Sequence, residues 1–205
     1  LPPKIHRQFE KRFSIPIIET MGLTETGAQI LSNPLPPKSR KIGSPGIAYG
    51  NEIMVGDDNQ NPVAAHVEGE ILVRGPNVMQ GYLDRPEETA KTITAEGWLR
   101  TGDLGRMDED GFVFVTGRIK ELIIKGGENI APREVDEALL EHNAVLEAAA
   151  FPRSCADYGQ RVEACVCLKK GHNADEKELR EFCKSLIGAY KTPDRIYFLD
   201  DLPKG

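Results

Sequence analysis

The chain has 205 residues, a length that suits one large domain or two small ones. Apolar residues make up 40% and charged residues 28%, which is ordinary for a globular protein. The formal net charge of -6 argues against general nucleic-acid binding, which favours a basic surface. No apolar run approaches the roughly 20 residues of a membrane-spanning helix, so we expect neither a nucleic-acid partner nor a membrane span.

The four cysteines show neither CxxC spacing nor a histidine at zinc-ligand spacing. We therefore expect the cysteines to be small, buried hydrophobic side chains of a protein in a reducing compartment. The expected location of the protein is the cytoplasm. The chain begins Leu-Pro-Pro without a methionine and carries no signal-peptide pattern. Both ends are expected to be cut from a longer protein.

The first elements expected in chain order are a helix and a strand. Prolines at positions 2 and 3 predict a helix that continues through Phe13. Ile5, Phe9 and Phe13 recur every four residues, which gives this helix one apolar face. The segment Ile15–Ile18 predicts a short buried strand, which leads into the glycine-containing segment Met21–Gly27.

Residues 46–115 have the pattern of a small, mostly β unit. Strands are expected between clusters of turn-forming residues, at Glu52–Val55, Gly69–Arg74 and Gly111–Val115. One short helix, Pro86–Ile93, interrupts them, with its proline at a favourable first position and two acids in its first turn. The first domain is expected to cover residues 1–117.

From Arg118 onward, strands and helices alternate. The expected strands are Ile119–Lys125, Val145–Phe151, Val162–Leu168 and Arg195–Leu199, and the expected helices are Pro132–His142 and Asp175–Ile187. This alternation predicts a second, compact α+β domain over residues 118–205.

Thr24 and Glu25 follow a predicted strand and a glycine, where open α/β sheets commonly bind ligands. A hydroxyl beside a carboxylate can hold a phosphate oxygen and a hydrated Mg²⁺ together, because one or two carboxylates plus substrate phosphates usually bind Mg²⁺. The alternative is structural: Thr24 caps a helix and Glu25 lies in its first turn. The residues alone leave both interpretations open.

Asp103 and Arg118 are a candidate pair for a nucleotide. The Asp103 carboxylate lies between glycines and can accept two hydrogen bonds from a ribose diol. Its alternative is a turn in which the aspartate binds its own backbone. Arg118 offers planar, bidentate recognition of phosphate, and its alternative is a surface or interdomain ion pair.

Three further residues follow Arg118. Lys120 lies near the start of an expected strand, and its structural alternative is a solvent-exposed residue at that strand start. Gly126 and Gly127 either form an ordinary turn or allow a ligand to approach the backbone closely.

Four segments occur in order along the chain. They are Met21–Glu25, Gly69-Glu70-Ile71 followed by Gly75 and Gly81-Tyr82, Trp98–Asp103, and Gly117–Glu134. Together they resemble the aromatic-Gly-x-Thr-Glu, Gly-Glu-Leu…Gly…Gly-Tyr, Thr-Gly-Asp and hinge motifs of the adenylate-forming family. This family includes acyl-CoA synthetases, firefly luciferase and the adenylation domains of peptide synthetases. The resemblance covers essentially the whole chain, but only the later part of the family's fold.

The resemblance implies an α+β fold. Residues 1–117 would end a large AMP-binding domain with a β-rich, barrel-like subdomain, and residues 118–205 would form a lid. It also implies an ATP-dependent carboxylate–CoA ligase, which converts a small or fatty carboxylic acid to acyl-AMP and then to a thioester. The implied cofactors are ATP or AMP, Mg²⁺ and coenzyme A.

The resemblance also implies roles for residues of the first domain. Met21 and Gly22 would lie along the adenine, Thr24 would bind phosphate, and Glu25 would bind Mg²⁺. Asp103 would hold the ribose hydroxyls. Methionine at position 21 departs from the family, which usually has an aromatic ring there.

Further roles follow for the hinge motif. Arg118 would reach the ribose or a phosphate, and Lys120 would occupy the hinge about which the lid turns. The loop at Gly126 and Gly127 would approach the pantetheine arm of coenzyme A.

Two of the family's parts have no counterpart in this sequence: the phosphate loop and the late catalytic lysine. We therefore expect the chain alone not to catalyse adenylation efficiently. The segment Ser32–Pro37, with Arg40 and Lys41, is similar to the branch that acts on oxalate and other small acids. The alternatives to a CoA ligase are a carrier-protein-loading adenylation domain and a non-catalytic nucleotide-binding module.

Overall fold

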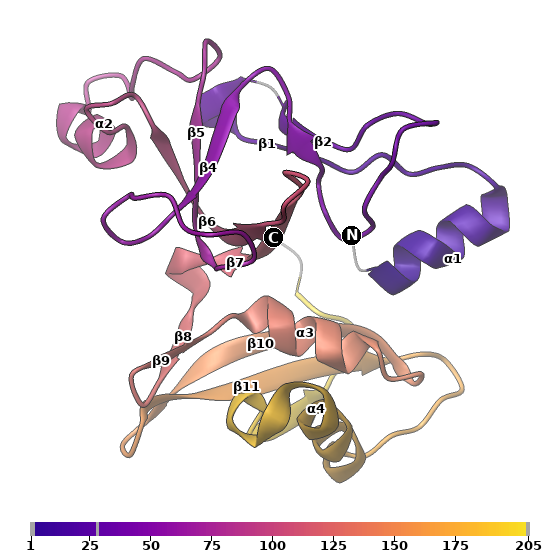
Figure 1. Ribbon diagram of the computed structural model, residues 1–205. Helices are drawn as coiled ribbons and strands as arrows, with labels where there is room; N and C mark the ends of the chain where they lie inside the picture. The colour runs from indigo at the N-terminus through magenta and orange to yellow at the C-terminus, as the bar shows by residue number, and fades with distance from the viewer. Residues whose placement is uncertain (1–2, 28, 204–205) are drawn as a thin grey trace. The chain divides into compact units, whose positions relative to one another are not determined.

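The computed structural model describes residues 3–27 and 29–203 (Figure 1). It divides into two compact units, Leu1–Ile119 and Lys120–Gly205, whereas the expected division followed residue 117. Both units combine helices with sheets, so the α+β class expected from the sequence is confirmed. Among the described residues, no helix is both long and apolar enough to cross a membrane.

The first unit contains two antiparallel sheets and two helices. The helices are α1 (Pro3–Phe13) and α2 (Pro86–Thr92), and Thr24–Thr26 forms a short 3-10 helix. The strands are β1 (Thr20–Gly22), β2 (Gln29–Ser32), β3 (Ile47–Ala48), β4 (Glu52–Gly56), β5 (Gly69–Arg74), β6 (Leu99–Met107) and β7 (Val113–Arg118). One sheet has the order β1-β2-β3, and the other has the order β4-β5-β6-β7.

The two sheets of the first unit share one hydrophobic core. Its buried members are Ile30, Leu31, Ile71, Val73, Leu99 and Val113. The four-stranded sheet is open, because its edge strands β4 and β7 do not pair with each other in the described part of the chain. The sheet therefore does not close into the expected barrel-like form. Instead, Ile30 and Leu31 of β2 pack against the buried residues of the four-stranded sheet.

The start of the chain differs from expectation. Helix α1 forms as predicted from position 3, while position 2 lies outside the described residues. Ile15–Ile18 is not a strand, and Ile15 is 57% exposed. Apolar composition alone does not provide a pairing partner. Here the Ile17 amide donates to the Glu10 carboxylate at 2.8 Å, and strand pairing begins only at Thr20.

Strand β6 was not expected from the sequence. Its nine residues include Gly102 and Gly105, which interrupt the alternation of apolar and polar residues that marks a strand. Pairing with both β5 and β7 forms the strand in spite of them. The β6–β7 register shifts between Leu104 and Gly105, which is a β-bulge beside Asp103.

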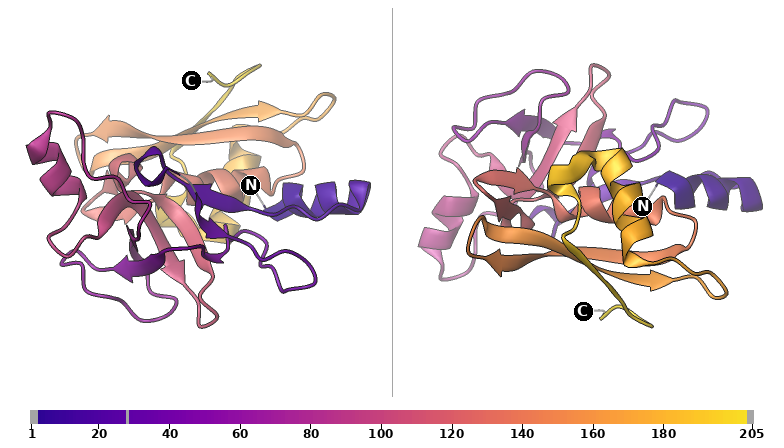
Figure 2. Two further views of the ribbon diagram at one scale, coloured as in Figure 1. Left: turned by 90° about the horizontal axis from the view of Figure 1, so that it is seen from above. Right: turned by 90° about the horizontal axis from the view of Figure 1, so that it is seen from below.

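The second unit is a five-stranded sheet with two helices on one face (Figures 1 and 2). Its strands are β8 (Ile123–Lys125), β9 (Glu128–Ile130), β10 (Val145–Cys155), β11 (Gly159–Leu168) and β12 (Arg195–Phe198). Its helices are α3 (Pro132–Leu140) and α4 (Glu176–Lys191). The sheet has the order β10-β11-β8-β9, and β12 pairs in parallel with β11.

Helices α3 and α4 cover the core of the second unit. The buried residues on the helices are Val135, Ala138, Leu139, Leu179 and Cys183. Those on the sheet are Ile123, Ile130, Val145, Val162, Ala164, Val166 and Ile196. One expected strand is wrong here: Ile119–Lys125 is broken into a 3-10 helix, Ile119–Glu121, and the short strand β8.

Helix α3 carries an unusual carboxyl group. Asp136 is partly buried, and its Oδ1 accepts a hydrogen bond from the Ala150 amide at 2.5 Å. The pKa of Asp136 is raised from 3.8 to about 7, chiefly by burial; the hydrogen bond from Ala150 opposes this rise, and the carboxylates of Glu137 and Glu121 add to it. The folded protein therefore keeps a proton that the unfolded chain releases at lower pH.

We expect Asp136→Asn to stabilise the protein at pH 8 and to have little effect near pH 4. The unfolded chain binds fewer protons than the folded one between pH 4 and 7, so the contribution of Asp136 to stability falls as the pH rises through this window. At about 1.36 kcal/mol per pKa unit, roughly 4 kcal/mol is the upper bound, because the side chain is only partly buried.

Urea unfolding of the parent and the variant at about pH 4.5 and about pH 8, the two ends of the titration window, checks this expectation. The exposed residue Asp157 of the same unit provides the matched control, as Asp157→Asn. A gain in unfolding free energy that is the same at both pH values would contradict the assignment.

Candidate functional site

Thr24 and Glu25 lie in the short 3-10 helix that follows β1. The cap position belongs to Leu23, and the hydroxyl of Thr26 makes the capping contacts, accepting from the Leu23 amide at 3.2 Å and donating to the Leu23 carbonyl at 2.9 Å. Thr24 is exposed, and its hydroxyl has no hydrogen-bond partner among the described residues. The capping alternative therefore does not apply to Thr24.

A distant segment holds this turn in place. The Met79 amide donates to the Glu25 carbonyl at 2.8 Å, and the Asn77 side-chain amide donates to the Thr26 carbonyl at 2.9 Å. The Tyr82 phenol donates to Glu25 Oε1 at 2.8 Å. Both the backbone and the carboxylate of Glu25 are therefore fixed by residues 77–82.

The contact with Glu25 also affects Tyr82. The hydrogen bond to the carboxylate, helped by desolvation, raises the pKa of the Tyr82 phenol, so it remains a proton donor at neutral pH. The second oxygen of Glu25, Oε2, accepts no hydrogen bond from the described residues. One oxygen is therefore held by the protein and the other is available to a ligand.

Met21 and Gly22 precede this turn in β1. The Met21 side chain is half-buried and packs against the core of the first unit, and Met21 pairs with Leu31 of β2. Gly22, at the end of the strand, is exposed. Only part of the Met21 side chain is therefore open to a ligand.

Asp103 and Arg118 meet across the β6–β7 ladder. They are register partners, and Arg118 Nε lies 2.8 Å from Asp103 Oδ1. Asp103 is 4% exposed, whereas the Arg118 side chain is 59% exposed. Asp103 lies within strand β6 rather than in a turn, and its carboxylate contacts the neighbouring strand β7. The ion-pair alternative for Arg118 applies, and the pair lies within the first unit.

Glu70, on β5, holds the Thr-Gly-Asp segment from the neighbouring strand. Its buried carboxylate accepts from Arg100 Nε at 2.9 Å and from the Gly102 amide at 3.1 Å. The Thr101 hydroxyl donates to the Ile71 carbonyl at 2.7 Å. Sequence reasoning assigned no role to Glu70, although the Gly-Glu motif that contains it was the available signal.

The remaining site residues belong to the second unit. Lys120 is exposed in the 3-10 helix Ile119–Glu121, and its ammonium makes no hydrogen bond or ion pair with the described residues. Gly126 and Gly127 connect β8 to β9, with φ of 56° and 86°. A two-residue hairpin of type I′ requires positive φ at both positions, so the turn interpretation is sufficient to explain both glycines.

Lys125 is committed to the interior of the second unit. It is 7% exposed, its Nζ donates to the Tyr190 carbonyl at 3.1 Å, and it lies 3.6 Å from Asp194 Oδ2. The Tyr190 phenol donates to the Lys125 carbonyl. These contacts tie the base of the Gly126 hairpin to the end of α4.

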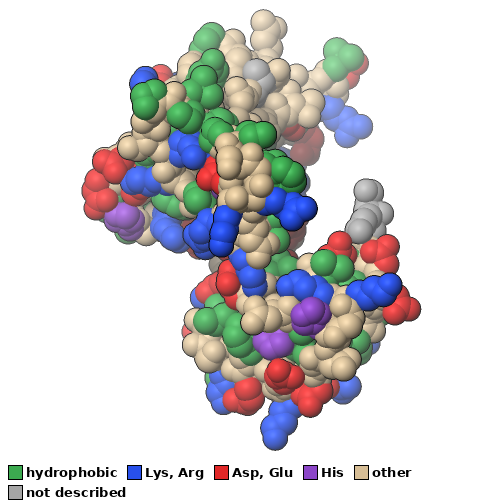
Figure 3. Space-filling view, turned by 90° about the vertical axis from the view of Figure 1, so that its right-hand side faces the viewer, with side chains coloured by type: hydrophobic (Ala, Val, Ile, Leu, Met, Phe, Trp, Pro, Cys, Tyr) green, Lys and Arg blue, Asp and Glu red, His purple; other side chains and the backbone are tan. Residues whose placement is uncertain are grey.

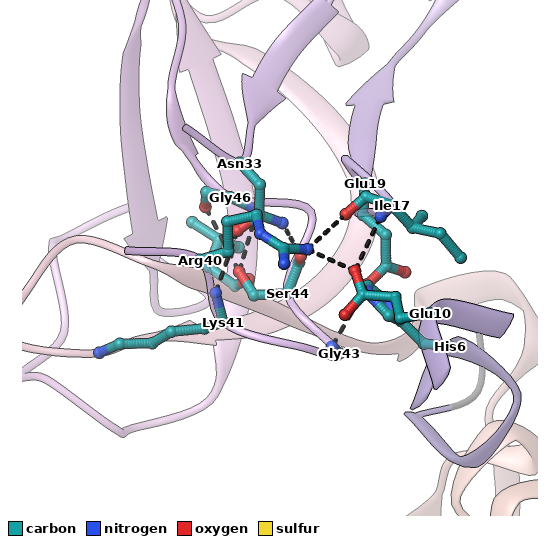
Figure 4. A network of polar contacts seen from close by, with 11 residues as sticks. His6, Glu10, Ile17, Glu19, Asn33, Arg40, Lys41, Gly43, Ser44 and Gly46 are labelled. Carbon is teal, nitrogen blue, oxygen red and sulfur yellow. Dashed lines mark hydrogen bonds and ion pairs between the residues drawn. The ribbon is translucent and has the colours of Figure 1, made fainter. Parts of the chain in front are cut away.

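Arg40, one of the two basic residues that follow the segment Ser32–Pro37, belongs to a polar network around His6 (Figure 4). His6 is 1% exposed, with Nδ1 at 3.1 Å from Glu19 Oε2 and Nε2 at 3.1 Å from Glu10 Oε1. Arg40 donates to Glu10 Oε1 at 2.6 Å and to the Ile17 carbonyl at 2.9 Å. The Arg40 hydrogen bond, followed by the Ile17 amide, lowers the pKa of Glu10 to about 2.

Lys41 is likewise engaged in the fold. Its Nζ lies 2.6 Å from Asp108 Oδ2 and 2.7 Å from Asp110 Oδ2. On the face drawn in Figure 3, acidic and basic side chains lie among one another. Arg40 and Lys41 therefore connect segments of the first unit rather than standing free for an anion.

Two family profiles match the chain. The AMP-binding enzyme profile covers residues 1–83, and the AMP-binding enzyme C-terminal domain profile covers residues 134–205. With the fold and the four motifs described above, these matches show that the chain belongs to the AMP-binding enzyme family.

Known relatives are similar over the whole of this chain. A sulfoacetate–CoA ligase of Cupriavidus necator is 50% identical over 100% of this chain and 40% of its own length. An oxalate–CoA ligase of Saccharomyces cerevisiae is 42% identical over 100% of this chain and 38% of its own length. ATP-bound MatB from Rhodopseudomonas palustris matches in structure with a TM-score of 0.93 and 34% identity, over 99% of this chain and 40% of that one. The chain thus spans about 40% of the length of these relatives.

Proposed function

We propose that the full-length protein is an AMP-forming carboxylate–CoA ligase. The observation that carries the proposal is the presence, within one unit, of both the fixed Thr24–Glu25 turn and the buried Asp103 carboxylate held by Arg118. Together they present an exposed hydroxyl, a directed carboxylate and a charged pair, which are the groups that a magnesium nucleotide needs.

Asp103 is proposed to accept hydrogen bonds from the ribose hydroxyls. Its carboxylate is oriented by Arg118, and Glu70 holds the neighbouring backbone through Gly102. An acceptor fixed before binding loses little conformational freedom when the ligand arrives. Arg118, being largely exposed, is proposed to reach the ribose or a phosphate as well.

Magnesium is proposed to bind at Glu25. The residues fit such an ion, because Glu25 Oε2 is available and the adjacent Thr24 hydroxyl is exposed. The described residues contain no cluster of three or more metal-ligating side chains, and Mg²⁺ in nucleotide sites commonly takes one or two carboxylates together with phosphate oxygens. When bound, the ion neutralises phosphate charge.

The chemistry is proposed to proceed in two balanced steps. A carboxylate oxygen of the acid attacks the α-phosphorus of ATP, which forms acyl-AMP and releases pyrophosphate. The sulfur of coenzyme A then attacks the acyl carbon, which forms the thioester and releases AMP, while the thiol proton passes to solvent. Electrostatic stabilisation and positioning are the contributions expected of the protein.

Residues 118–205 are proposed to be the lid, following the end of the large AMP-binding domain at residue 117. Lys120 is proposed as its hinge, because a residue with an exposed side chain and no partner among the described residues can change its backbone angles at little cost in contacts. Gly126 and Gly127 are proposed to approach the pantetheine arm of coenzyme A, since both are exposed.

The proposed substrate is a small carboxylic acid that carries a second anionic group. Sulfoacetate and oxalate, after which the two relatives described above are named, share this feature. The described cysteines are all free thiols, which supports a reducing compartment, and the cytoplasm is the proposed location.

Thioester formation by the full-length protein tests this proposal. Purified protein, ATP, Mg²⁺ and coenzyme A are incubated with sulfoacetate, oxalate, malonate, acetate and a long-chain fatty acid, and acyl-CoA is measured. We expect turnover with at least one dianionic acid to exceed turnover with acetate and with the fatty acid. Preference for the fatty acid would overturn the substrate class, and absence of any acyl-CoA would overturn the ligase.

A further inference from the structure

The Tyr82 phenol makes the side-chain contact that directs the Glu25 carboxylate. It donates to Glu25 Oε1 at 2.8 Å, although 57 residues separate the two along the chain. Tyr82 remains 38% exposed, so its ring is not a core residue. Packing in the core therefore does not explain the tyrosine at position 82, whereas the hydrogen bond to Glu25 does.

A second set of contacts fixes Tyr82 itself. Its backbone amide donates to Thr89 Oγ1 at 2.9 Å, and the same hydroxyl donates to the Arg85 carbonyl at 2.9 Å. A Cβ added at Gly81 would lie 2.7 Å from Thr89 Cγ2 and 2.9 Å from Thr89 Oγ1, so the Thr89 side chain would have to shift. Glycine at this position is thus what allows helix α2 to hold the segment so closely.

We propose that Tyr82 is a positioning residue for the metal site, acting through Glu25. By occupying Oε1, it turns Oε2 toward the ligand and fixes the carboxylate in one rotamer before the magnesium nucleotide arrives. Helix α2 holds the backbone of Tyr82 in place through the Thr89 hydroxyl. This inference rests on the proposed function in one respect only, the assignment of Mg²⁺ to Glu25.

The test is the binding of ATP to the full-length protein by isothermal titration, with Mg²⁺ and with excess EDTA. In the parent, Mg²⁺ is expected to strengthen ATP binding. In Tyr82→Phe, this gain is expected to fall by about tenfold, in keeping with the loss of one hydrogen bond to a charged group, while binding in EDTA stays unchanged. The phenylalanine keeps the ring, so the fold is expected to be retained.

Tyr49→Phe is the matched control. Tyr49 is a 61% exposed tyrosine of the same unit, and its phenol has no hydrogen-bond partner among the described residues. Its variant is expected to bind ATP as the parent does under both conditions. A Tyr82→Phe variant with the parental magnesium gain would overturn the inference, as would an equal loss of affinity with and without Mg²⁺.

A double-mutant comparison separates positioning from a direct role. If Tyr82 acts through Glu25, Tyr82→Phe has little further effect on the magnesium gain in a Glu25→Gln background. Additive losses would overturn the inference. A parent that binds ATP with Mg²⁺ but forms no acyl-adenylate would contradict the proposed ligase alone, so the two failures are distinguishable.

Discussion

Replacing Asp103 with alanine in the full-length protein is expected to raise the ATP KM by about a hundredfold, since each hydrogen bond to a charged group contributes about 1.5–3 kcal/mol. The carboxylate that is proposed to hold the ribose is lost. Arg118, its partner at 2.8 Å, then loses the contact that orients it. The expected effect is therefore mainly on nucleotide binding.

Asp103→Asn keeps the size and shape of the side chain and separates binding from folding. We expect it to retain a melting temperature near that of the parent while still weakening ATP binding. Asp58→Ala, at an exposed position of the same unit, is the matched control and is expected to leave the ATP KM unchanged. An unchanged ATP KM in Asp103→Ala would reject the ribose assignment.

Lys120→Pro is expected to separate the two half-reactions. Proline fixes φ, so a hinge at this position could no longer turn, whereas the conformation that carries out adenylation need not be affected. We expect adenylation to change little and thioester formation to fall by about a hundredfold, the scale that a small misplacement of reacting groups produces. Acid-dependent pyrophosphate exchange measures the first step, and transfer from preformed acyl-AMP to coenzyme A measures the second.

Lys120→Ala is the control for the loss of the ammonium. It keeps the backbone free to turn, and the side chain makes no hydrogen bond or ion pair with the described residues. We expect it to affect thioester formation far less than the proline variant does. Equal losses of both half-reactions in Lys120→Pro would refute the hinge.

Elements with a continuous local pattern could be predicted from the sequence. Strand β5 has its expected bounds, Gly69–Arg74, because it is an apolar run between turn-forming residues. Strand β6 could not be predicted, since its glycines remove the pattern and its formation depends on pairing with β5 and β7. At Ile15–Ile18 the reverse holds: the local pattern is present, but the described residues provide no pairing partner.

The candidate site shows the same division between local and tertiary information. Residue type and neighbouring glycines are local features, so they were enough to make Glu25 and Asp103 candidates, while the resemblance to the family supplied their proposed roles. These local features could not show that Leu23 takes the cap position, or that Tyr82 reaches Glu25 from a distance of 57 residues in sequence. Glu70 was missed for the same reason, since its partners lie on the next strand.

The most direct test of the account is the identity of the nucleotide product. The full-length protein is incubated with ATP, Mg²⁺, coenzyme A and its best carboxylic acid, and the nucleotides and phosphates are separated and quantified. We expect AMP and pyrophosphate in amounts equal to the thioester formed. Formation of ADP and inorganic phosphate with the thioester would contradict it.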